Sequence, residues 1–132
     1  RRANIIWRHF NGIPSRIVPD ENWQLREDSM VADLRTARAQ YPHDAELASL
    51  IADLRTGSSR FEELWQRGDV TAHVAARKTF DHPSVGRVTV DCDVLTVRTS
   101  DLRVVAYTAE PGTEDAEKLN LLRVLGTQQL TG

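Results

Sequence analysis

The sequence is poor in cysteine and lysine, and it contains no long apolar run. Its one cysteine, Cys92, excludes an internal disulfide and any zinc site built from several cysteines. No apolar stretch approaches the roughly 20 residues that a membrane-spanning helix needs, and no signal peptide is recognisable. We therefore expect a cytoplasmic protein that uses no metal, no cofactor and no membrane contact.

The charge of the chain argues against direct binding to nucleic acid. Of its 17 basic residues only Lys78 and Lys118 are lysines, which leaves 17 − 2 = 15 arginines, and these are interleaved with 19 acidic residues. The net charge of −2 provides no polycation that could release counterions from DNA or RNA. With 132 residues the chain is long enough for one ordinary core, so we expect a single domain over residues 1–132. Because it opens on Arg1-Arg2 without a methionine, we expect a fragment of a longer protein.

Helical patterns fill the chain up to Gly68. Apolar residues at steps of three and four, bounded by capping and breaking residues, predict four helices there. They are a first helix with Ile5, Ile6, Trp7 and Phe10, a second from about Asp20 to Gln40, a third capped by Asp44 and ended by Gly57, and a fourth begun by a capping box at Ser59–Glu62 and ended by Gly68.

After Gly68 the apolar period changes from helical to two, which indicates strands. Alternation predicts one strand from Val70 to Phe80, a turn at "DHPSVG", a second strand from Val88 to Val94 and a third from Leu102 to Thr108. A last helix follows from about Thr113 to Leu125, with Thr113 as its cap. Helices, then an antiparallel meander, then a helix define an α+β fold.

The sequence offers few catalytic candidates. The best is His73 with Asp91 or Asp93, because the expected turn would bring His73 near Asp93 and Arg77 near Asp91 on one sheet face. Pairing of opposite charges across strands accounts for the same pattern without catalysis. Cys92, on the apolar side of its strand, is typical of a buried hydrophobic residue rather than a nucleophile.

The stretch "YTAEPGTEDAE" has the strand, turn and helix order of a phosphate-binding loop but not its chemistry. It holds one glycine, at Gly112, and four acids that would repel a phosphate at the helix N-terminus. We interpret it as a turn into the closing helix.

Three stretches taken together resemble the ligand-binding domain of MmyB-like transcription regulators. They are "FEELWQRGDV" at 61–70, "KTFDHPSVGRVTVD" at 78–91 and "RVVAYTAEPGTEDAEKLNLL" at 103–122, in the order and spacing of that family. The resemblance covers essentially all of the chain and is strongest after residue 58. It implies a PAS-like fold, as in the C-terminal domain of Xre-type helix-turn-helix regulators, with no catalytic residues.

What the resemblance implies about function is the sensing of a small apolar molecule such as a fatty acid. We expect a pocket between helices and sheet, drawn from Trp7, Phe10, Trp65, Val74, Phe80, Val90, Val104 and Tyr107. DNA would be bound only through a missing N-terminal domain, and we expect a homodimer. The alternatives are a ligand-free dimerisation or interaction module, and a small enzyme using His73 with Asp91 and Asp93.

The chain departs from that family at its beginning. By this resemblance we expect the helix-turn-helix and the first strand of the PAS-like sheet to be missing from the fragment, and that strand would lie beside the last one. The strand from Leu102 to Thr108 should therefore have an open hydrogen-bonding edge. We predict that a neighbouring chain or a rearranged segment covers this edge.

Overall fold

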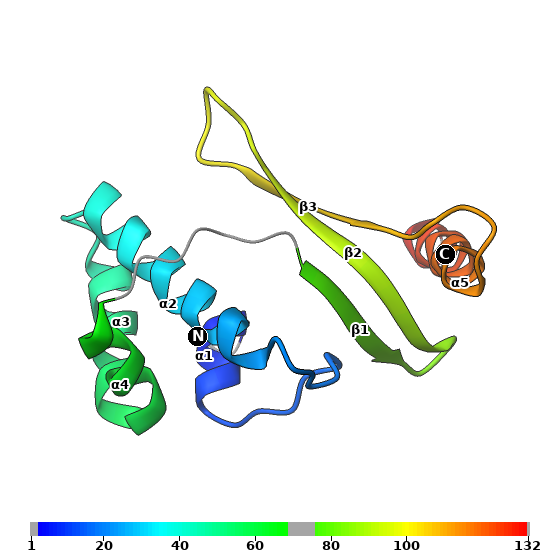
Figure 1. Cartoon of the computed structure of the whole chain (residues 1–132). Helices are drawn as coiled ribbons and strands as arrows, with labels where there is room; N and C mark the ends of the chain where they lie inside the picture. The colour runs from blue at the N-terminus through cyan, green and yellow to red at the C-terminus, as the bar shows by residue number, and fades with distance from the viewer. Residues whose placement is uncertain (1–2, 69–75, 132) are drawn as a thin grey trace. The chain divides into compact units, whose positions relative to one another are not determined.

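The computed structural model describes residues 3–68 and 76–131 and confirms the α+β class (Figure 1). Its elements run in chain order as helices α1 (Ile5–Phe10), α2 (Trp23–Gln40), α3 (Ala45–Gly57) and α4 (Ser59–Arg67), strands β1 (Ala76–His82), β2 (Gly86–Thr96) and β3 (Arg103–Thr108), and helix α5 (Glu114–Thr131). The chain divides into two compact units, a helical one (residues 1–15 and 19–73) and a sheet unit (residues 16–18 and 74–132).

The helical unit is built around one apolar cluster. Phe61 of α4 and Leu54 of α3 are completely buried in it. The other buried members are Val31, Leu34, Ile51 and Leu64, and Ile6, Trp7, Phe10, Leu47, Leu50 and Trp65 pack against them. All four helices therefore contribute to a single core.

The ends of the helices follow from local capping chemistry. The Asp44 carboxylate accepts from the backbone N–H of Leu47 at 3.0 Å, as predicted, and Gly68 ends α4 with a left-handed φ of 66°. The predicted capping box is wrong by one residue. Ser58 rather than Ser59 caps α4, because the Ser58 hydroxyl accepts from the Phe61 N–H at 3.2 Å.

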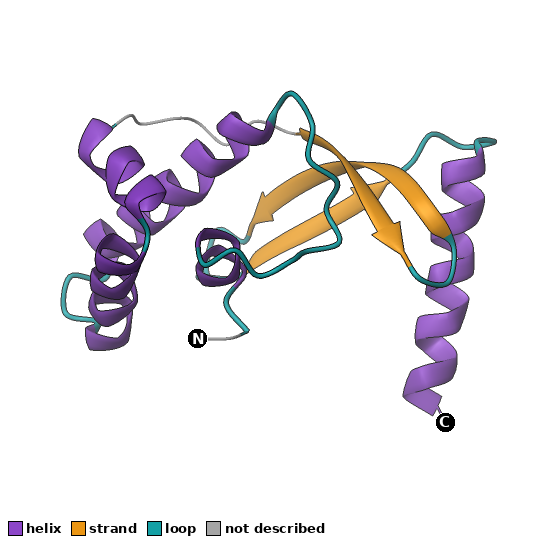
Figure 2. Cartoon of the chain, turned by 90° about the horizontal axis from the view of Figure 1, so that it is seen from below, coloured by secondary structure: helices purple, strands orange, loops and turns teal. Residues whose placement is uncertain are grey.

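The sheet unit is an antiparallel meander with strand order β1-β2-β3. Figure 2 shows it as a twisted sheet with α5 at one end. The expected pairing of Arg77 with Asp91 is confirmed, and so is the helix cap, since the Thr113 hydroxyl accepts from the Ala116 N–H at 3.2 Å. Residues 70–75 of the first predicted strand lie outside the described residues.

Side chains from the N-terminal turns of α5 bond to backbone groups of β2 beyond the end of β3. The last pair between β2 and β3 joins Asp91 to Thr108. Beyond it, the Asp115 carboxylate accepts from the Thr89 N–H at 2.9 Å, and Lys118 donates to the Arg87 carbonyl at 2.7 Å. Asp115 thus bonds to the sheet, and the acids of this first turn suit the positive end of the helix dipole.

The two edges of the sheet differ. At β1, the segment 16–18 forms a bridge between Ile17 and Phe80, with hydrogen bonds from Val18 N–H to the Thr79 carbonyl and from Asp81 N–H to the Arg16 carbonyl. At β3, no strand of the described residues lies on the outer side. Among the described residues, no rearranged segment covers β3. Cover of β3 by a neighbouring chain stays a prediction.

Candidate ligand-binding face

The register of the sheet gathers apolar side chains on one face. Val88, Val90 and Cys92 alternate along β2 and are all buried. Phe80 pairs with Val88 and Tyr107 pairs with Cys92, and paired residues of antiparallel strands share a face. Three of the predicted wall residues, Phe80, Val90 and Tyr107, therefore lie on this surface, which we call the apolar sheet face.

Two aromatic rings meet across this face. The centroids of Phe80 and Tyr107 are 5.4 Å apart, and the rings stand at 82° in an edge-to-face arrangement. Tyr107 remains 47% exposed. Its partial burial, together with the adjacent Cys92 thiol, raises the pKa of the Tyr107 phenol. The ring pair thus combines an apolar surface with a hydroxyl that stays protonated at neutral pH.

Val104 lies on the opposite face of the sheet from Phe80, Val90 and Tyr107, and its part in a ligand pocket stays a prediction. It pairs with Leu95, whose side chain points to the opposite side of β2 from Val94. Val105 pairs with Val94 instead and shares the face of Tyr107. Residues 104 and 105 are both valines, so sequence alternation alone did not reveal which of them shares that face.

The aromatic residues expected from the helices lie in the core of the helical unit. The Phe10 ring is 5.1 Å from that of Phe61 in an edge-to-face contact, and Trp65 stacks on Phe61 at 5.7 Å. The Arg35 guanidinium lies 4.5 Å from the Trp65 ring centroid, within cation–π range. Trp7 also packs against this core. Their part in a ligand pocket stays a prediction, and Val74 lies outside the described residues.

Asp91 and Asp93, the two acids of the enzyme alternative, lie on the other face of the sheet. Arg77 Nε lies 3.2 Å from the Asp91 carboxylate, and both side chains are more than half exposed. The neighbouring pair, Thr79 and Thr89, joins its hydroxyls at 2.9 Å. This is the cross-strand pairing expected of a solvated face. His73 lies outside the described residues, and among those described no group of three His, Cys, Asp or Glu side chains could hold a metal ion.

A buried ionic network in the helical unit was not predicted. Glu27 of α2 is 7% exposed, and its two carboxylate oxygens face two different helices. One lies 3.0 Å from His9 Nε2 of α1, and the other accepts from Arg60 Nε of α4 at 2.8 Å. The three residues are far apart in the sequence, and no spacing rule connects them.

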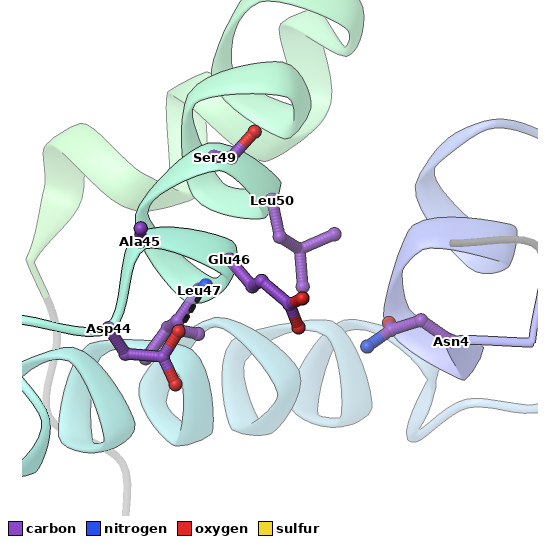
Figure 3. Close-up of a pocket in the computed structure, with 7 residues that line it drawn as sticks. All are labelled: Asn4, Asp44, Ala45, Glu46, Leu47, Ser49 and Leu50. Carbon is purple, nitrogen blue, oxygen red and sulfur yellow. Dashed lines mark hydrogen bonds between the residues drawn. The ribbon is translucent and has the colours of Figure 1, made fainter.

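An open hollow of about 620 Å³ lies beside the N-terminal turns of α3. Figure 3 shows Asn4 across it from α3. It is lined by Asn4, Asp44, Ala45, Glu46, Leu47, Ser49 and Leu50, and by none of the predicted wall residues that the structure describes. Asp44 already caps the helix there, and the lining mixes polar residues with Ala45, Leu47 and Leu50.

Ligand sites in proteins are lined mostly by apolar and aromatic side chains, which the apolar sheet face provides. The family model of the MmyB-like transcription regulator ligand binding domain matches residues 1–122, and the chain belongs to this family. The family is defined by ligand binding in a regulator rather than by catalysis. Neither a curated protein nor a solved structure matches the chain. No helix among the described residues has the length and hydropathy to cross a membrane.

Proposed function

We propose that the chain is the effector-sensing domain of a helix-turn-helix DNA-binding regulator of the Xre type, and that its effector is a small apolar molecule such as a fatty acid. Membership of the MmyB-like family supports the sensing role. The net charge of −2 fits a domain that leaves DNA contact to a separate domain of the regulator. We further propose that the regulator acts in the cytoplasm as a homodimer.

The observation that carries the choice of an apolar effector is the apolar sheet face. Val90 is already covered within the protein, at 2% exposure, whereas Tyr107 and Val105 remain 47% and 48% exposed. An acyl chain lying over these two side chains would remove their apolar surface from water, which favours binding at about 25 cal/mol per Å². The Tyr107 hydroxyl provides a hydrogen-bond donor for a polar end of the ligand.

Binding must favour one conformation to act as a signal. A ligand shifts a conformational equilibrium only as far as it binds the two states with different affinity. In this proposal the ligand selects the state in which the apolar sheet face is arranged around it. The DNA-binding domain responds to that state.

The direct test is to identify what the protein retains. The 132-residue chain, purified without detergent, is analysed by native mass spectrometry and by organic extraction. We expect an apolar molecule at up to one equivalent, and we expect that added long-chain fatty acid raises the mass of stripped protein. Protein that is free of ligand and unaffected by fatty acids at concentrations near 100 µM would contradict the apolar-effector proposal.

A further inference from the structure

The two faces of the sheet differ in the charged residues that they carry. Directly paired residues share a face and successive residues alternate, so the register assigns each strand residue to one face. The acidic residues of the three described strands all lie on the face opposite the apolar sheet face, and they are Asp81, Asp91 and Asp93. The basic residues on the apolar sheet face are Lys78 and, at strand ends, His82 and Arg103. Among the residues of these strands, the apolar sheet face therefore carries basic side chains and no acidic one.

Lys78 is the basic residue of this face that lies within a strand rather than at its end. It is half-buried, and its partner in the register is the buried Val90. Among the described residues, the Lys78 ammonium makes no hydrogen bond and no ion pair. The Lys118 ammonium, in contrast, donates to the Arg87 carbonyl at 2.7 Å and lies 3.3 Å from the Glu114 carboxylate. Lys78 therefore has three N–H donors that an anion could use.

The register also places Lys78 beside the aromatic pair. Phe80 and Tyr107 have their partners on β2 on either side of Val90, and their ring centroids are 5.4 Å apart. The contact between the rings therefore spans the position of Val90, which is the partner of Lys78. Neither Lys78 nor Val90 belongs to β3, so their placement does not depend on what borders that strand.

We propose that Lys78 binds the head group of the effector, and that the effector is an amphiphile whose single negative charge is a carboxylate. The inference rests on the proposed function, because it assigns the polar end of the same ligand. The apolar tail would lie over Tyr107 and Val105, and the carboxylate would accept a charge-assisted hydrogen bond from the Lys78 ammonium. One lysine balances one negative charge, which favours a carboxylate over a phosphate with nearly two. A neutral lipid would leave the ammonium without an acceptor.

The first test compares two ligands that share a tail and differ in the head group. Equilibrium dialysis of the stripped 132-residue chain gives the Kd of radiolabelled dodecanoate and of dodecanol. We expect the wild-type protein to bind dodecanoate about tenfold more tightly, as a hydrogen bond to a charged group would provide. Lys78→Met keeps a long apolar side chain without the charge, so dodecanoate should lose that advantage while the affinity for dodecanol stays unchanged. Lys78→Arg should retain the preference for the acid.

Arg77→Gln is the matched control for net charge. Arg77 is the neighbour of Lys78 on β1 and lies on the opposite face, where it pairs with Asp91. The variant removes the same positive charge as Lys78→Met and should keep the preference for dodecanoate. Equal affinities of the wild-type protein for acid and alcohol, or equal losses of the preference in Arg77→Gln and Lys78→Met, would overturn the assignment of Lys78.

The second test needs no variant, because the chain contains only two lysines, Lys78 and Lys118. Acetic anhydride labels both ammonium groups, and mass spectrometry of the peptides gives a rate for each. Saturating dodecanoate should slow the acetylation of Lys78 several-fold and leave Lys118, the internal reference, unchanged. An unchanged rate at Lys78, with dodecanoate shown by dialysis to be bound, would reject the proposed contact.

The outcomes separate this inference from the proposed function. Equal binding of dodecanoate and dodecanol would remove the role of Lys78 and leave an apolar effector standing. A protein that binds neither compound would contradict the apolar effector and, with it, the assignment of Lys78.

Discussion

The backbone N–H of Thr89 donates to the side chain of Asp115 at 2.9 Å, so a helix residue replaces a strand as the partner of β2. Three residues further along α5, Lys118 donates to the Arg87 carbonyl. Beyond the point where β3 ends, side chains from the first turns of α5 therefore provide hydrogen-bond partners for the Thr89 N–H and the Arg87 carbonyl of β2.

Loss of the Asp115 carboxylate should destabilise the sheet unit. Asp115→Ala leaves the half-buried Thr89 N–H without its acceptor and removes a favourable charge from the helix start, at a cost of about 1–2 kcal/mol. Urea unfolding followed by circular dichroism measures this free energy. Glu114→Ala is the control, because the Glu114 side chain is 82% exposed and its ion pair with Lys118 should contribute at most about 0.5 kcal/mol. Equal effects of the two variants would show that the contact with β2 contributes nothing.

The Glu27 network should stabilise the helical unit. Glu27→Ala removes the partner of both His9 and Arg60, and breaking a buried ionic contact costs about 3 kcal/mol, less here because the Arg60 side chain is 36% exposed. Glu63 also pairs with Arg60 but is 60% exposed, so Glu63→Ala should cost less than about 0.5 kcal/mol. Thermal unfolding of the two variants provides the comparison. A Glu27→Ala protein as stable as Glu63→Ala would argue against the network.

The contact between α3 and α4 should give a pH dependence with a definite sign. The Arg55 guanidinium donates two hydrogen bonds to Glu62, and Gln66 donates another, which lowers the pKa of the Glu62 carboxyl to about 2. A lowered folded-state pKa means that the contribution to stability is present above the ordinary value of 4.5 and is lost as the pH falls from there towards 2.

Titration of the Glu62 side chain by NMR measures this pKa directly. Arg55→Ala should return it towards 4.5, and Gln66→Ala should raise it by less. A Glu62 pKa near 4.5 in the wild-type protein would rule out the contact in solution.

The two faces of β3 allow a paired test of ligand binding. Tyr107→Ala should weaken binding of a fluorescent fatty acid about tenfold, through lost apolar contact. Val104→Ala removes a side chain of similar exposure from the opposite face and should leave the affinity unchanged. Weakening by Val104→Ala alone would place the ligand on the other face.

The sequence predicted those parts of the fold that depend on short-range signals. The caps at Asp44 and Thr113 and the pairing of Arg77 with Asp91 were all recognisable within a few residues of a turn or helix start. The cap of α4 was misplaced because Ser58 and Ser59 are adjacent, and Glu62, which fits the spacing of a capping box, binds Arg55 instead.

What the sequence could not predict depends on the register or on contacts between distant residues. Val104 and Val105 are chemically identical, and only their pairing with β2 decides which shares a face with Tyr107. His9, Glu27 and Arg60 come from three helices, and a buried carboxylate between two basic groups leaves no periodic pattern. The bridge from Ile17 to Phe80 likewise joins segments that no local rule connects.

That bridge determines how the chain can be divided. Residues 16–18 belong to the sheet unit, whereas the segments on both sides of them, up to residue 15 and from residue 19, belong to the helical unit. No single cut of the polypeptide yields both units intact. A fragment beginning at Val74 would lack the hydrogen bonds that Arg16 and Val18 make with β1, so a shortened version for biophysical work should retain the N-terminal segment or supply residues 16–18 as a peptide.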